Sequence, residues 1–261
     1  MSLHDPRERS RRGSELQSAV LAQPECEPAT LFESSWRDFV YAEVWSRPGL
    51  ERRARYLVAI AGAASAGGPP PVLEGYLRGA LESGELTLDE LREGALQVAV
   101  YAGWSAGALL DECLTRVASA RKPRASSYAP LSAEPGDAAA RIVSARAVFE
   151  RVARTPSPPP FSPYIEAGVL GLAFGELWTR AALDQRARRW LTLTCVAHSA
   201  AQMPIRSHSY STLASGDATR EELHEFVLQL AVHAGWPRAA VIHGAILEMA
   251  ERVAKGLPFE G

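Results

Sequence analysis

Apolar residues recur at helical spacing along most of the chain. In the segment 223–234, "LHEFVLQLAVHA", Leu223, Phe226, Val227, Leu230 and Ala231 follow the i, i+3, i+4, i+7 pattern of one helix face. Alternating runs rich in β-branched residues, which would indicate strands, are few. The pattern therefore predicts an all-α protein with little or no sheet.

The helical pattern occurs twice along the chain, in two similar segments. Residues 76–104 aligned with 208–236, an offset of 132, give 14 identical positions out of 29. Upstream, "WSRPGLERRARYL" (45–57) aligns with "WTRAALDQRARRW" (178–190) at an offset of 133. Identity at this level is typical of an internal duplication. We therefore predict two tandem homologous helical domains, at 29–120 and 138–256.

Both copies carry the same signals for the start and end of helices. "GELTLDEL" and "GDATREEL" each place a threonine after a glycine and a glutamate three residues after the threonine. Thr87 with Glu90 and Thr219 with Glu222 match the capping box that begins a helix. Both copies then close on "AGW", where the glycine predicts a helix end.

The segments outside the two copies are polar or rich in proline. Residues 1–28 are polar, and we expect a disordered tail there. Residues 121–137, within "ARKPRASSYAPLSAEPGD", read as a Pro/Ser/Ala-rich linker. The first segment has no apolar run typical of a signal peptide, and the most apolar window is too short to span a membrane.

Composition narrows the class of partners. The net charge is −2 with 28 basic and 30 acidic side chains, so the chain lacks the basic excess of a nucleic-acid-binding protein. The three cysteines are far apart and odd in number, which is typical of a reducing compartment without a disulfide framework. We expect a cytoplasmic, soluble protein that binds neither nucleic acid nor membranes.

The repeated blocks resemble the carboxymuconolactone decarboxylase family, which shares its fold with alkylhydroperoxidase D. The resemblance rests on the tryptophan and arginine entry at 45–57 and 178–190, the "L.SG.…T..EL.E" turn, and the "Q.AV.AGW" close. It covers roughly 170 residues and implies an all-α fold. It also implies that the two halves pack as a pseudo-dimer, and that three chains assemble as a homotrimer, which is a pseudo-hexamer.

The thiol peroxidase branch of this fold needs a Cys-x-x-Cys pair with a histidine four residues after the second cysteine. If His208 is that histidine, the cysteines belong at positions that hold Ala201 and Pro204. A dithiol cycle needs two sulfurs within reach of each other. The sequence therefore disfavours peroxidase chemistry.

Decarboxylation needs no thiol. It needs an acid near the reacting carbon and groups that stabilise an enolate. In the decarboxylase branch a histidine of the repeated turn is the proton donor, and it matches His208 here, whereas the first copy has Tyr76. We therefore expect the second copy to be the active half and the first copy to be degenerate.

Other residues complete the candidate site. The predicted catalytic set is His208, His198 and His233, and the predicted substrate-binding set is Arg206, Trp178, Trp236 and Tyr210. Arg206 is the candidate for binding a substrate carboxylate. For His198 and His233, packing as core histidines is the competing interpretation. The repeated Arg55 and Arg188 suggest architecture, such as salt bridges to the repeated Glu225 and Glu93.

The histidine spacing matches no short metal motif, so we predict no metal and no cofactor. The leading hypothesis is a lyase, a cofactor-independent decarboxylase acting on a carboxylated lactone or related carbonyl acid. Two alternatives stay open. One is a related cofactor-free cyclase, isomerase or hydrolase of a specialised pathway, and the other is a non-catalytic helical module for binding or assembly.

Overall fold

The computed structural model describes residues 5–121, 128–131 and 137–259. These residues form helices and connections, and they contain no β-strand. The all-α prediction is therefore confirmed. Most of the predicted linker, 121–137, lies outside the described residues.

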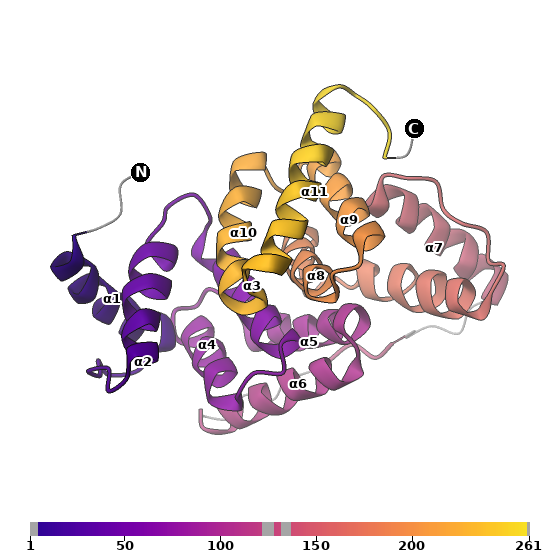
Figure 1. Cartoon of the computed structure of the whole chain (residues 1–261). Coiled ribbons are helices and arrows are strands. Elements are labelled where there is room, and N and C mark those ends of the chain that lie inside the picture. Colours follow the sequence, from indigo (N-terminus) through magenta and orange to yellow (C-terminus); the bar gives the residue numbers. More distant parts are fainter. Residues whose placement is uncertain (1–4, 122–127, 132–136, 260–261) are drawn as a thin grey trace.

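Each half of the chain contributes one set of helices (Figure 1). The first set is α1 (Pro6–Leu21), α2 (Leu31–Ser35), the π-helix η1 (Trp36–Trp45), α3 (Arg52–Ser65), α4 (Pro70–Glu82), α5 (Leu88–Ala102) and α6 (Trp104–Ser119). The second set is α7 (Ala138–Ala153), the π-helix η2 (Tyr164–Phe174), the short 3₁₀-helix η3 (Leu177–Thr179), α8 (Gln185–Ser199), α9 (Gln202–Ser215), α10 (Arg220–Ala234) and α11 (Trp236–Ala254).

The signals predicted to start and end the helices of the repeat are present in both halves. Thr87 and Thr219 each cap a helix, with the glutamate three residues later returning the bond, so both capping boxes are formed. Gly84 and Gly216 both have φ of +72°, a left-handed conformation that favours glycine.

The polar N-terminal segment is not the disordered tail that its composition predicts. Residues 6–21 form α1, which packs on η1 and α4. Tyr56 Oη donates to the carbonyl of Val20 (2.8 Å), and Val20 is fully buried. A single apolar stripe on an otherwise charged helix is enough to dock it, although the mean hydropathy of the segment is low.

Helix α1 also has a counterpart, which extends the repeat. Arg189, at the position equivalent to Tyr56, donates to the carbonyl of Val152 on α7. The chain thus docks α1 on the first half and α7 on the second through equivalent bonds. In Figure 1 these two helices lie at opposite ends of the molecule. The first repeat therefore begins before residue 29.

The two halves exchange helices to build one core. Helix α5 of the first half packs on α8 of the second, and α10 of the second half packs on α3 of the first. The counterparts α3 and α8 also pack on each other. Leu57 and Leu91 therefore share a single apolar cluster with Leu191 and Phe226.

Buried hydrogen bonds between the two halves stabilise this exchange of helices. Arg55 donates to Gln229 Oε1 (3.0 Å) and to Glu225 Oε2 (3.2 Å) of the other half. Arg188 does the same with Gln97 Oε1 (2.9 Å) and Glu93 Oε2 (3.2 Å). The predicted architectural role of the repeated arginines and glutamates is confirmed, and each pair joins one half to the other.

Candidate functional site

His208 meets Tyr101 of the other half edge to face, with ring centroids 5.3 Å apart. His208 lies on α9 and Tyr101 on α5, so the exchange of helices brings them together. Trp178 Nε1 donates to Tyr101 Oη (2.8 Å). These residues together with Arg189 and Cys195 are named the His208 centre.

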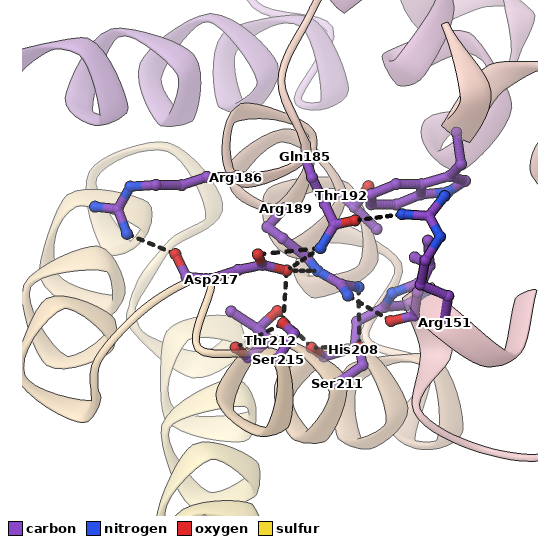
Figure 2. Close-up of polar contacts among 12 residues, drawn as sticks. Arg151, Gln185, Arg186, Arg189, Thr192, His208, Ser211, Thr212, Ser215 and Asp217 are labelled. Atoms are coloured by element: carbon purple, nitrogen blue, oxygen red, sulfur yellow. Dashed lines mark hydrogen bonds and ion pairs between the residues drawn. The ribbon is translucent and has the colours of Figure 1, made fainter. Parts of the chain in front are cut away.

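Arg189 supplies a buried positive charge beside this centre. Its guanidinium carbon lies 5.1 Å from the centroid of the Trp178 ring, a cation–π arrangement. Its Nε donates to Asp217 Oδ2 (2.9 Å), and its Nη1 donates to Ser211 Oγ (3.0 Å). Figure 2 shows Arg189 and Asp217 facing each other, with His208 close to the same cluster. The buried charge of Arg189 is therefore compensated by the partly exposed carboxylate of Asp217.

Asp217 is held ionised in this cluster. Burial alone would raise its pKa, but hydrogen bonds from Ser215, Arg189 and Gln185 keep the pKa below its usual value. Ser215 Oγ donates to Asp217 Oδ2 at 2.6 Å, and Gln185 Nε2 donates to the same oxygen at 2.8 Å. The arginine and the aspartate thus form a charged pair with its hydrogen bonds satisfied.

The titrating groups of the His208 centre are strongly shifted. Burial, and secondarily Arg189, lower the pKa of His208 to about 3. The residue is still partly exposed, and within the described residues its ring nitrogens form no hydrogen bond. Burial raises the pKa of Tyr101 to about 12. At neutral pH both rings are therefore uncharged.

His233 belongs to a second, equivalent centre. Its ring meets Tyr76 edge to face at 5.6 Å, and Tyr76 stacks on Trp45 at 5.8 Å. His198 lies nearby and, after burial, helps to lower the pKa of His233 to about 3. These residues together with Tyr41 are named the His233 centre. Each centre thus pairs a histidine of the second half with a tyrosine of the first.

The seven predicted site residues therefore divide between several places. His208 and Trp178 share one centre, and His198 and His233 share the other. Trp236 is 57% exposed and packs edge-on against Phe39 of η1. Tyr210 donates to the carbonyl of Leu257 (3.2 Å), which ties the C-terminal segment to α9.

Arg206 is not placed to share a site with His208. It forms an ion pair with Glu248 of α11 at 2.7 Å. Because Arg206 and His208 are two residues apart on one helix, their side chains point in directions about 160° apart around the helix axis. The predicted role of Arg206 as the anion anchor of His208 is therefore corrected.

Sequence reasoning missed Tyr101 and Arg189 as partners of His208. Tyr101 aligns with His233 in the repeat, but only the exchange of helices shows that it faces His208. The segment "RARRW" departs from "RARYL" at Arg189 and at Trp190. Arg189 was a signal that could be read in the sequence, since a third arginine in this helix needs a partner when it is buried.

Two pockets open elsewhere on the described surface. The larger, about 880 Å³, is lined by charged residues that include Arg92, Glu93 and Arg180. The smaller, about 280 Å³, lies between equivalent residues of the two halves, among them Arg53 and Arg186. Neither includes His208.

In the described part of the chain no three His, Cys, Asp or Glu side chains are grouped to hold a metal. No helix of that part is long and apolar enough to cross a membrane.

Comparison with known proteins finds relatives for the first half of the helical fold. The chain is 36% identical over 104 residues to the 4-carboxymuconolactone decarboxylase of Acinetobacter baylyi (strain ATCC 33305 / BD413 / ADP1), a match that covers 37% of this chain and 76% of that relative. The sequence profile of the Carboxymuconolactone decarboxylase family matches residues 31–110, which is the repeat that carries Tyr76 and Tyr101. The protein therefore belongs to the carboxymuconolactone decarboxylase family.

Proposed function

We propose that the chain is a cofactor-independent decarboxylase that acts on a carboxylated lactone or related carbonyl acid at the His208 centre. The observation that carries the proposal is the meeting of His208 with Tyr101, whose hydroxyl is already held by Trp178. Membership of the family supports chemistry of the decarboxylase type.

The two rings have complementary tasks in such a reaction. When the bond to the carboxylate carbon breaks, carbon dioxide leaves and the electron pair passes to the neighbouring carbonyl as an enolate. Tyr101 Oη accepts from Trp178, so its own proton is left to donate to the enolate oxygen. His208 then delivers a proton to the carbon and is reprotonated from water.

The low pKa of His208 fits an anionic substrate. Without a ligand, burial and Arg189 keep the imidazole neutral, with a pKa of about 3. A carboxylate brought against the ring favours its protonated form and raises this pKa. The acid is therefore formed when the substrate binds, with the proton taken from solvent.

The test is the release of carbon dioxide from 4-carboxymuconolactone by the purified chain. We expect His208→Asn to lower kcat/KM by at least about 100-fold and Tyr101→Phe to lower kcat more than it changes KM. His243→Asn is the matched control, since His243 is exposed on α11 away from both centres. Equal rates for the His208 variant and the wild type would contradict the proposal.

A non-catalytic helical module is the second candidate, and one observation favours it. The ring of His208 packs edge to face on Tyr101 and is kept uncharged by burial, which lowers its pKa to about 3, as expected for a histidine that fills a packed centre. Cofactor-free cyclisation, isomerisation or hydrolysis are variants of the first proposal. A panel of lactone acids and β-keto acids separates them, because the module predicts no turnover of any compound.

A further inference from the structure

Two exposed histidines face each other on the outer side of α10 and α11, outside the His208 and His233 centres. The ring centroids of His224 on α10 and His243 on α11 are 5.8 Å apart, with an interplanar angle of 76°. Neither ring forms a hydrogen bond or an ion pair within the described residues. A neutral imidazole carries one nitrogen lone pair, and here both lone pairs are left open to solvent.

The repeat shows that this place links two helices in the first half. At the repeat offset of 132, Arg92 corresponds to His224, and Asp111 corresponds to His243. Arg92 of α5 donates to Asp111 of α6, so an ion pair joins those two helices. Helices α10 and α11 pack on each other as α5 and α6 do (Figure 1).

The second half therefore holds two bases where the first half holds a base and an acid. Two imidazoles cannot form an ion pair with each other, and if both are protonated they repel. A cation bound between the two nitrogen lone pairs restores an electrostatic link between the helices. The change from Arg92 and Asp111 to two histidines is thus a change from an ion pair to a pair of metal ligands.

We propose that His224 and His243 form a binding site for one divalent transition-metal ion, with water completing its coordination. Imidazole nitrogen suits zinc, copper and nickel, whereas magnesium and calcium take oxygen ligands. Among the residues that the structure describes, no third His, Cys, Asp or Glu side chain is grouped with the pair, which leaves the other positions to water. The proposal does not depend on the reaction at the His208 centre.

The separation of the rings fits a shared metal ion. Two imidazoles bound to zinc through nitrogens at about 2 Å, in tetrahedral geometry, have their ring centroids about 5 Å apart. The centroids of His224 and His243 need to approach by less than about 1 Å to reach this distance. Exposed side chains change rotamer within nanoseconds, so the two rings can make this small movement while the helices stay in place.

The neighbouring charges neither block the site nor add a strong ligand. Arg220 and Glu221 lie one turn before His224 and are exposed, so their charges offset each other. Glu225 follows His224 but is already paired with Arg47 at 2.6 Å. The affinity therefore comes from the two imidazoles, and Cu²⁺ should bind more tightly than Ni²⁺ or Zn²⁺.

The test is calorimetric titration of the chain, purified without a histidine tag and freed of metal with EDTA. We expect Zn²⁺ to bind saturably at one ion per chain, and Mg²⁺ to give no binding. Two ligands held on packed helices act together, so His224→Asn and His243→Asn should each weaken Zn²⁺ binding at least about tenfold. Cys26→Ser removes an exposed thiol that could also bind zinc, and it should leave the titration unchanged.

A double variant keeps the link between the helices but removes the ligands. His224→Arg with His243→Asp copies the pair of the first half, so it should unfold in urea like the metal-free wild type or at higher urea. Zn²⁺ should raise the melting temperature of the wild type and leave that of the double variant unchanged. Equal Zn²⁺ binding by the double variant, no saturable binding by the wild type, or equal binding of Mg²⁺ would each overturn the proposal.

Discussion

His208 and His233 are two histidines that the fold keeps uncharged. Burial is the main cause in each case, and both have a pKa of about 3 against 6.5 for a free side chain. Between these values the unfolded chain binds protons that the folded chain does not. The stabilising effect is therefore complete above about pH 6.5 and is lost as the pH falls toward 3.

The two uncharged histidines make the stability of the fold depend on pH between 5 and 7, where carboxylates of ordinary pKa do not titrate. We expect the melting temperature to fall steadily from pH 7 to pH 5 in the wild type, as measured by circular dichroism. The double variant His208→Gln, His233→Gln should show a flatter profile over the same range. A wild-type profile that is already flat there would mean that both rings accept protons in the folded state.

Arg189 and Asp217 offer a second test at the scale of single residues. Arg189 is 1% exposed, so Arg189→Leu leaves Asp217 as a partly buried charge with only neutral hydrogen-bond donors. We expect a loss of about 3–5 kcal/mol in the free energy of unfolding, measured by urea denaturation. Arg11→Leu, which breaks exposed pairs on α1, should lower the free energy of unfolding far less.

The sequence could place His208 in a repeated turn, but it could not place its partners. Periodicity tells which residues share a helix face, and it places Arg206 and His208 on different faces of α9. Tyr101 was hidden for another reason. Its contact with His208 depends on which half α5 packs against, and no local pattern carries that information.

At the scale of elements, the exchange of α5 and α10 is fixed by two equivalent sets of buried bonds. Glu93 accepts from Arg180 (2.6 Å) and Arg188 (3.2 Å), and Glu225 accepts from Arg47 (2.6 Å) and Arg55 (3.2 Å). The two sets should therefore contribute to stability in similar measure.

We expect Glu93→Ala and Glu225→Ala to lower the free energy of unfolding by similar amounts, about 3 kcal/mol each. Removing a cap with Thr87→Ala or Thr219→Ala should cost only about 1 kcal/mol. Urea denaturation of the four variants ranks them. A large cost on one glutamate and none on the other would show that the halves are not held together in an equivalent way.

Helix boundaries were the most predictable feature, because a capping box or a C-terminal glycine is formed by residues that are close together in the sequence. The two π-helices and α1 were not. The apolar stripe of α1 is narrow, and its docking depends on Tyr56 and Arg78, which lie far along the chain and bond the carbonyls of Val20 and Leu21.

At the scale of the molecule, each half lacks part of its own core. A chain cut within 121–137 should give two fragments that are poorly folded alone and that form one helical complex when mixed. Circular dichroism and size-exclusion chromatography follow both states. Independent cooperative unfolding of the separate fragments would contradict the shared core.

The assembly of whole chains is a further proposal. Trp104 and Trp236 occupy equivalent positions and are 62% and 57% exposed, which marks two related apolar places on the surface. We propose the homotrimer implied by the family resemblance, with a mass about three times 28.2 kDa. Light scattering that gives the mass of a single chain would exclude it.

Because each centre contains one ring from each half, a mutation in one half affects a residue of the other half. A mutation at position 101 alters the surroundings of His208, and a mutation at position 233 alters those of Tyr76. A change that unfolds either half should therefore disturb the surroundings of both histidines. The two copies could drift apart in residue type but not be lost, and laboratory evolution of either centre should randomise positions in both halves at once.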